Sequence, residues 1–105
     1  MARKEKYNVA VVGALGMVGS EMIRTLERRN FPVDEFRPLD VPENAGKTVE
    51  FNGKPVEVQA AVKENFAGID IAIFSAGATA SKSLAPQAVE MGAVVVDNSS
   101  QWRMD

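Results

Sequence analysis

Three glycines, placed between an apolar run and an amphipathic segment, constrain the fold of this chain more than any other feature. Residues 7–12 are mostly β-branched and apolar, which is typical of a strand buried on both faces of a parallel sheet. Gly13-Ala-Leu-Gly16-Met-Val-Gly19 follows, and apolar residues then recur at helical spacing until near Asn30. A dinucleotide-binding turn needs a tight bend, a bare backbone and a small residue where helix meets strand, and these glycines fit those roles. The alternative is a turn that needs glycines for packing alone.

The rest of the chain alternates strands and helices. We expect a strand over residues 33–39, short or irregular because Pro38 lacks an N–H, then a hairpin of 48–51 and 55–59 around Asn52-Gly53. Next we expect a strand over 69–74 and a helix over 81–91 that stops at Gly92, followed by a strand over 93–97. Pro86 should lie in the first turn of that helix or kink it. The pattern predicts an α/β, Rossmann-type, doubly wound and mainly parallel sheet with helices on both faces, plus a small hairpin.

Composition narrows the function. A length of 105 residues fits one dinucleotide-binding domain over 1–105, and the formal net charge of −2 argues against nucleic acid or an acidic membrane as partner. The sequence has no Cys and no His, so it offers no cysteine nucleophile and no site built on the commonest metal ligands. The lack of these ligands predicts that the protein has no metal site. The apolar run before the glycines is too short for a membrane span or a secretory signal, which predicts a cytoplasmic protein.

Asp40 is the candidate for cofactor discrimination. It follows the second expected strand and lies roughly 20 residues after the last glycine, where a dinucleotide fold places a carboxylate that binds the adenosine ribose. Such a carboxylate repels a 2′-phosphate and favours NAD over NADP. A solvated aspartate that caps a turn before Pro42 is an equally good interpretation of the sequence.

Four blocks of sequence resemble aspartate-semialdehyde dehydrogenase. They are the glycine-rich loop, Asn44-Ala-Gly46-Lys47, Ser75-Ala-Gly-Ala-Thr79, and Val96-Asp-Asn-Ser-Ser-Gln-Trp-Arg-Met-Asp105. That family reduces aspartyl phosphate to the semialdehyde with NADPH, through a cysteine thioester. Its subunit is much longer, so the resemblance covers only the N-terminal part, ahead of the active-site cysteine and the later substrate-binding arginine and histidine.

The resemblance implies roles for particular residues. The loop would contact the cofactor diphosphate, the block after the strand over 69–74 would border the adenosine and nicotinamide, and the final block would approach the nicotinamide. The candidate cofactor-binding residues are therefore Gly13, Leu15, Gly16, Met17, Val18, Gly19, Asp40, Ser75, Ala76, Gly77, Asn98 and Ser99. Arg103 matches a family arginine that holds the substrate phosphate, a task that suits the planar guanidinium. No catalytic residue is assigned.

Two departures from the family bear on cofactor binding, the first on affinity and the second on the choice of cofactor. Leu15 stands where the family usually has threonine, which removes a hydroxyl contact to phosphate. The family's Ala-Ser-x-Arg-Ser, which grips the 2′-phosphate of NADP, is replaced by Asp40-Val-Pro-Glu-Asn44, which removes a cation and hydroxyl donors and adds the negative charges of Asp40 and Glu43. We therefore predict NAD rather than NADP. A change so concentrated also suggests a domain engineered for compactness or for a different cofactor.

The missing residues predict binding without turnover, which leaves open whether this chain is an enzyme at all. The alternatives are a packing scaffold, engineered or not, that binds no cofactor, or simply the front of an active oxidoreductase. The apolar edge beyond residues 94–97 predicts self-association into a homo-oligomer.

Overall fold

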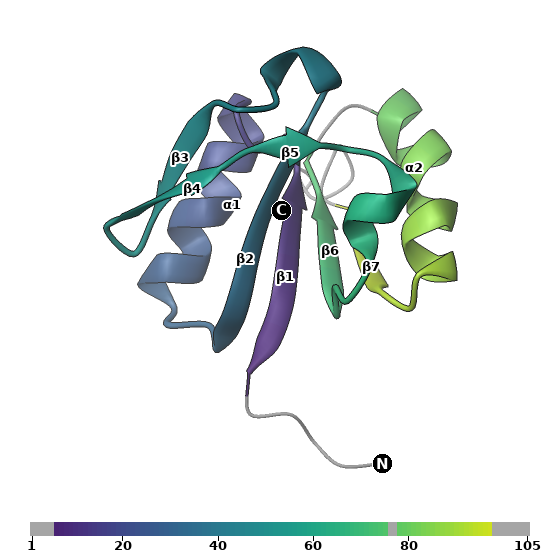
Figure 1. Cartoon of the computed structure of the whole chain (residues 1–105). Helices are drawn as coiled ribbons and strands as arrows, with labels where there is room; N and C mark the ends of the chain where they lie inside the picture. Colours follow the sequence, from purple (N-terminus) through teal and green to yellow (C-terminus); the bar gives the residue numbers. More distant parts are fainter. Residues whose placement is uncertain (1–5, 76–77, 98–105) are drawn as a thin grey trace.

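The structure, a computed structural model, describes residues 6–75 and 78–97 (Figure 1). Its strands are β1 (Tyr7–Val12), β2 (Val33–Asp40), β3 (Thr48–Phe51), β4 (Lys54–Glu57), β5 (Gln59–Ala60), β6 (Ile71–Phe74) and β7 (Val94–Asp97). Its helices are α1 (Met17–Arg28) and α2 (Ala78–Glu90), with short 3-10 turns η1 (Pro42–Asn44) and η2 (Lys63–Phe66).

Five strands form one sheet in the order β5-β2-β1-β6-β7, and every neighbouring pair in it is parallel. Counted along the chain, these strands have the order 3-2-1-4-5 of a doubly wound dinucleotide-binding sheet. The chain winds outward from β1 in one direction through β2 and β5, and in the other through β6 and β7. The order therefore reverses between β1 and β6, and ligands of open α/β sheets bind beyond the carboxyl ends of the strands at such a point.

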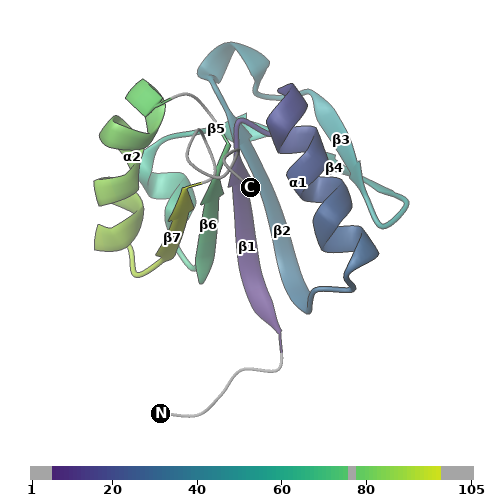
Figure 2. The same cartoon turned by 180° about the vertical axis from the view of Figure 1, so that it is seen from behind.

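The two faces of the sheet are covered by different elements (Figures 1 and 2). Alternate residues of β1 point to opposite faces, so Val9 and Val11 join a buried cluster with Ile23 and Leu26 of α1, while Ala10 and Val12 join a second cluster with Ala88 of α2. The predicted Rossmann-type fold, with helices on both faces and a small hairpin, is confirmed.

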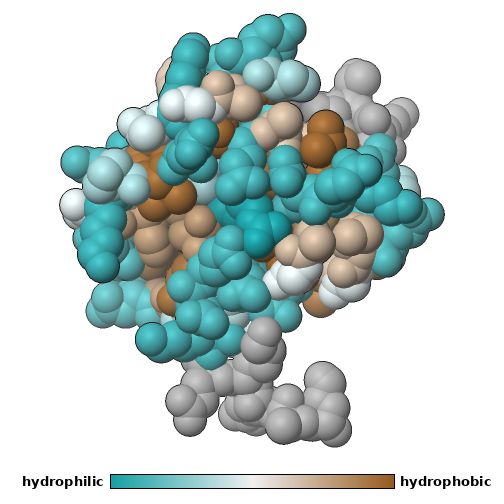
Figure 3. Space-filling model, viewed as in Figure 1, coloured by the Kyte–Doolittle hydropathy of each residue, from teal (hydrophilic) through white to brown (hydrophobic). Residues whose placement is uncertain are grey.

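The hairpin β3–β4 is antiparallel and packs on the face that carries α1. Asn52 and Gly53, the predicted turn, have φ of 53° and 82°, as a two-residue turn with both central residues left-handed requires. Phe51 stacks on Phe36 of β2, with ring centroids 4.4 Å apart. In Figure 3 apolar residues are visible toward the left, on the side where the hairpin lies beside β2, and hydrophilic residues cover much of the remaining face.

Three details of the expected elements were wrong. Gln59 belongs to β5 of the main sheet rather than to the hairpin, because the chain leaves β4 at Glu57 and crosses to β2 through the buried Val58. Helix α2 begins at Ala78, so Pro86 lies well inside it; its expected place in the first turn was wrong, and the alternative, a kink at Pro86, stays a prediction. Strand β2 runs through Pro38 for 8 residues, so the expectation of a short strand was wrong, whereas its pairing with β1 is irregular, with a register shift between Tyr7 and Val9.

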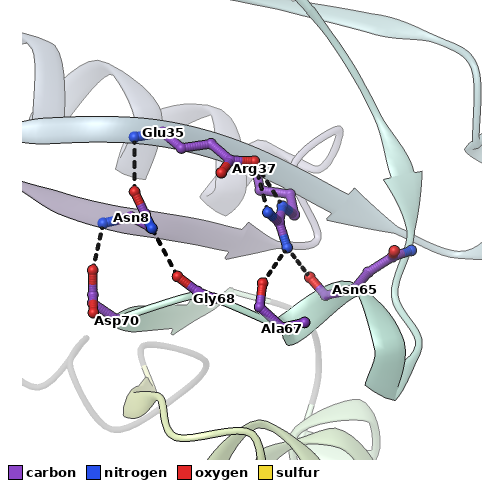
Figure 4. Close-up of polar contacts among 7 residues, drawn as sticks. All are labelled: Asn8, Glu35, Arg37, Asn65, Ala67, Gly68 and Asp70. Carbon is purple, nitrogen blue, oxygen red and sulfur yellow. Dashed lines mark hydrogen bonds and ion pairs between the residues drawn. The ribbon is translucent and has the colours of Figure 1, made fainter.

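Polar side chains tie the strands together away from their carboxyl ends (Figure 4). The side chain of Asn8 in β1 accepts a hydrogen bond from the Glu35 backbone amide of β2 at 3.2 Å and donates one to the Gly68 carbonyl at 2.8 Å. The backbone amide of Asn8 donates to the Asp70 carboxylate at 2.8 Å. These contacts hold β2 and the segment before β6 on either side of β1. Asn8 lies where the pairing of β1 with β2 shifts register, between Tyr7 and Val9, so these bonds connect the strands at that irregularity.

Candidate functional site

The glycine-rich loop turns sharply where β1 ends. Gly13 has φ of 86°, a left-handed conformation that favours glycine, and the amides of Gly13 and Ala14 both donate to the Leu39 carbonyl of β2, at 2.8 and 3.1 Å. Helix α1 passes so close to this turn that a Cβ on Gly19 would lie 2.0 Å from the Gly13 carbonyl oxygen. Two of the predicted structural roles, the tight bend and the close helix–strand approach, thus belong to Gly13 and Gly19.

Gly16 is the N-cap of α1 and supplies no side-chain hydrogen bond to it. The amides of the first three helical residues, Met17, Val18 and Gly19, have no acceptor within the helix, because an α-helix leaves its first donors without intrahelical partners. No acidic side chain stands in this first turn. The helix therefore presents bare N–H groups and its positive dipole end, an arrangement that binds phosphate without a basic side chain.

A cleft of about 470 Å³ opens beside the same turn. Its walls are Leu15, Gly16, Met17, Val18, Ser20, Glu21 and Arg24. The side chain of Met17, the first residue of α1, is 83% exposed. Leu15, in place of a hydroxyl, contributes only an apolar side chain to the wall.

Asp40 lies at the carboxyl end of β2 and contacts the loop directly. Its Oδ2 accepts the Leu15 amide at 3.0 Å, and its Oδ1 accepts the Val41 amide at 2.7 Å and the Asn44 side-chain amide at 3.2 Å. The sequence placed Asp40 near the site, but the bond to Leu15 was missed because it joins residues 25 positions apart. The turn-capping interpretation thus describes part of what this carboxylate does, and ribose binding by Asp40 stays a prediction.

Ser75 follows β6 and lies at the reversal point between β1 and β6. Its hydroxyl donates to the Val12 carbonyl at 2.6 Å, and its amide donates to the same oxygen at 3.0 Å. The hydroxyl proton is therefore used to tie β6 to the end of β1, while the oxygen keeps its acceptor capacity. The structure places Ser75 beside the glycine-rich loop, and its contact with the adenosine and nicotinamide stays a prediction.

Other candidates lie outside the described residues. They are Ala76, Gly77, Asn98, Ser99 and Arg103, and their assigned contacts stay predictions. Within residues 6–75 and 78–97, no group of three or more Asp or Glu side chains could hold a metal ion. No helix in the same ranges is long and apolar enough to cross a membrane.

Arg37, the basic residue of β2, makes hydrogen bonds within the protein that connect β2 to η2. Arg37, whose side chain is 15% exposed, pairs with Glu35 at 2.7 Å and donates to the Asn65 and Ala67 carbonyls, both at 2.8 Å (Figure 4). These bonds lock β2 to the η2 segment. Arg37 is thus held away from any ligand near Asp40, whose segment 40–46 contains the carboxylates Asp40 and Glu43 and no cation.

Resolved pKa shifts lie far from the loop. A hydrogen bond from Lys63 at 2.7 Å lowers the pKa of Glu90, and the same bond raises the pKa of Lys63. The pair joins η2 to α2 on the surface. It supports the face of the sheet opposite α1 and takes no part in the candidate site.

Comparison with known proteins decides the family. The model of the semialdehyde dehydrogenase NAD-binding domain matches residues 8–105, nearly the whole chain. The chain belongs to this family. Its resemblance to the dinucleotide-binding domain of aspartate-semialdehyde dehydrogenase, read from the four sequence blocks, is confirmed.

Individual members of the family show the extent of the match. Aspartate-semialdehyde dehydrogenase of Bacillus subtilis is 51% identical over 98 residues, which are 93% of this chain and 28% of that protein. The solved structure of aspartate semialdehyde dehydrogenase II of Vibrio cholerae, complexed with ASA, superposes with a TM-score of 0.84 at 48% identity, over 95% of this chain and 33% of that one. This chain thus spans about a third or less of the length of these relatives.

A more distant structure bears on the cofactor. Aspartate semialdehyde dehydrogenase of Candida albicans, solved with NADP, has a TM-score of 0.70 at 23% identity, over 95% of this chain and 31% of that one. At this identity the likeness shows the fold alone. It establishes that the fold accommodates NADP in that protein and leaves the choice of cofactor in this semialdehyde dehydrogenase domain to its own residues.

Proposed function

We propose that this chain is a dinucleotide-binding module that binds NAD in preference to NADP. The bare first turn of α1 carries the proposal: three amides without helical acceptors, a cap without a side chain and a close glycine contact form a cradle for a diphosphate. The candidate contacts are Gly13, Leu15, Gly16, Met17, Val18 and Gly19 for the diphosphate and Ser75 beside them. The family's NAD-binding domain description supports this assignment.

The preference for NAD rests on charge. A 2′-phosphate carries close to two negative charges near neutral pH, and at the end of β2 it would meet Asp40 and Glu43. Arg37, the cation of the same strand, is bound to Glu35 and to two backbone carbonyls. Repulsion by these two carboxylates favours the cofactor whose ribose bears hydroxyls only.

Calorimetric titration of the chain with NAD and with NADP in one buffer tests this function. We expect saturable binding with NAD at least about tenfold tighter, because one uncompensated charge contact costs on the order of 1 kcal/mol or more in a partly buried site. Asp40→Ala should weaken NAD and narrow the preference, whereas Glu50→Ala, on the exposed hairpin, should change neither. Tighter binding of NADP would contradict the assignment, and absence of binding by both would favour a packing scaffold.

We further propose that the chain binds without turnover. Its 105 residues contain no Cys and no His, so the thioester chemistry of the resembled family has no nucleophile here. A longer protein that carried this domain would act on aspartate semialdehyde, as the names of its relatives state. Reduction of NAD above the buffer rate by the 105-residue chain, with semialdehyde and phosphate present, would refute binding without turnover.

Self-association is proposed for the edge of the sheet. Within the described residues β7 pairs only with β6, and its Val94 and Val96 side chains are 64% and 37% exposed. An apolar edge strand that has no proline and whose one charged residue, Asp97, lies at its end is a template for pairing with a second copy.

A further inference from the structure

The hydrogen bonds of Asp40 limit what its carboxylate can accept. A carboxylate offers about four acceptor sites, two on each oxygen. Oδ1 already accepts the Val41 amide and the Asn44 side chain, and Oδ2 accepts the Leu15 amide. Oδ1 is therefore filled, and one site remains on Oδ2, the oxygen that also holds the glycine-rich loop.

We propose that Asp40 binds one hydroxyl of the adenosine ribose rather than both, and that Asn44 is the positioning residue responsible. This inference rests on the proposed dinucleotide site and specifies how that site reads the ribose. Two free oxygens would accept the 2′- and 3′-hydroxyls together. With Oδ1 filled, the second hydroxyl finds no acceptor on this carboxylate.

Asn44 is the donor that a substitution can remove. The other two donors to Asp40 are backbone amides, and the bond from the Asn44 side chain is the longest of the three, at 3.2 Å against 2.7 and 3.0 Å. The turn η1 does not depend on that side chain, because the Asn44 amide donates to the Val41 carbonyl and its carbonyl accepts the Lys47 amide. Asn44→Ala thus frees an acceptor site on Oδ1 while the backbone of the turn keeps its bonds.

The same carboxylate joins two parts of the site. Asn44 on η1 orients Asp40, and Asp40 holds the amide of Leu15 in the loop where a diphosphate would bind. The segment that selects the cofactor is therefore connected to the loop through one side chain. Loosening Asn44 is expected to reach Leu15, and this effect can be measured without any ligand.

The test uses three cofactors: NAD, its analogue without the adenosine 2′-hydroxyl and its analogue without the 3′-hydroxyl. For the unaltered chain, calorimetry should show that one analogue binds about tenfold or more weaker than NAD, which is the loss expected for a hydrogen bond to a charged acceptor. The affinity of the other analogue should lie within about threefold of the affinity of NAD. In Asn44→Ala the second analogue should lose affinity as well. Gln59→Ala, which removes an exposed amide from the neighbouring β5, is the matched control and should keep the pattern of the unaltered chain.

Clear results would overturn the proposal. Equal losses for both analogues in the unaltered chain would mean that Asp40 binds both hydroxyls, and no loss for either would mean that it binds none. An unchanged pattern in Asn44→Ala would refute the positioning role.

Amide hydrogen exchange of Leu15 in the ligand-free protein separates this proposal from the proposed function. Exchange should accelerate most in Asp40→Ala, less in Asn44→Ala and not at all in Gln59→Ala. If NAD itself fails to bind, the dinucleotide function fails, and this ordering still decides whether Asn44 positions Asp40. Exchange in Asn44→Ala equal to that in Gln59→Ala would overturn the positioning role.

Discussion

At the scale of single residues, two glycines of the loop have different physical tasks. Gly19 permits α1 to pass against the end of β1, where an added Cβ would meet the Gly13 carbonyl oxygen at 2.0 Å. Gly16, with φ of −79°, has an ordinary backbone conformation, and its added Cβ would lie 3.5 Å from the same oxygen. Packing therefore requires glycine at position 19, whereas position 16 tolerates a methyl group.

Gly19→Ala should consequently destabilise the fold. We expect a loss of about 2 to 3 kcal/mol in the free energy of unfolding, because backbone atoms must separate to admit the methyl group. Gly16→Ala, the matched control, should cost less than about 1 kcal/mol, the difference between a glycine and an alanine N-cap. Urea unfolding followed by circular dichroism measures both, and equal losses would show that α1 has no close contact at Gly19.

The sequence predicted the residues of the loop better than their partners. Spacing after a buried strand was enough to place the three glycines and to bring Asp40 near them. The bonds from Asp40 to Leu15 and from Asn44 to Asp40 depend on where β2 ends relative to the loop and on a side-chain rotamer. No one-dimensional pattern carries that information.

At the scale of elements, both helices end in the same motif. Asn30 and Gly92 have positive φ, of 50° and 97°, one residue beyond the cap of α1 and of α2. In each case the following amide bonds back to a carbonyl five residues earlier, Phe31 to Leu26 at 3.1 Å and Ala93 to Ala88 at 3.0 Å. Each motif thus satisfies carbonyls of the last helical turn before the chain enters the next strand.

The end of α1 should be the more sensitive of the two to substitution, because its left-handed residue is Asn30 rather than glycine. Asn30→Ala should lower the free energy of unfolding by about 1 kcal/mol, since alanine tolerates the left-handed conformation less well than asparagine. Arg29→Ala, one residue earlier at φ of −91°, should leave stability nearly unchanged. Thermal unfolding of the two variants compares them directly, and a loss in Arg29→Ala as large as in Asn30→Ala would contradict this account.

The pair between η2 and α2 predicts a pH effect. The hydrogen bond and charge of Lys63 lower the pKa of Glu90, so Lys63→Met should raise that pKa toward its ordinary value, while Lys54→Met on the hairpin should not. Because the pKa is lowered in the folded state, the pair stabilises above the ordinary glutamate pKa and loses its effect as pH falls through the lowered value. Both side chains are solvent-exposed, so added salt should reduce the shift; an NMR titration of Glu90 that showed no response to Lys63→Met would exclude the pair.

The prolines show where element prediction from sequence failed. The Leu39 carbonyl accepts bonds from the loop after β1, so alternation points the Pro38 nitrogen toward β5, which pairs with β2 only from Leu39 onward. No ladder donor is lost, and β2 continues. For α2, the residues before Ser81 gave no apolar period to mark an earlier start, which is why Pro86 was placed too near the first turn.

At the scale of the whole molecule, the two edges of the sheet differ. β5 at one edge has 2 residues, too short to template another chain, whereas β7 at the other edge exposes Val94 and Val96. The alternation of strands and helices in the sequence was enough to predict the doubly wound sheet. It did not reveal β5, because two residues carry no periodic signal.

Charge at the β7 edge should therefore reduce self-association. Val94→Lys combined with Val96→Lys should shift the chain toward monomer in light scattering at high concentration, since lysines on an edge strand oppose pairing. Val62→Lys, at a valine exposed elsewhere to 38%, is the control and should leave association unchanged. A strict monomer before any substitution would count against association through this edge.

The central claim is that a dinucleotide binds at the glycine-rich loop and the first turn of α1. Titration of the 15N-labelled chain with NAD, followed by NMR, tests it most directly. We predict saturable shifts concentrated in the amides of Leu15, Gly16, Met17, Val18 and Gly19, with little change in the hairpin amides. Saturable shifts that left these loop amides unchanged, or no shifts at millimolar NAD, would contradict the claim.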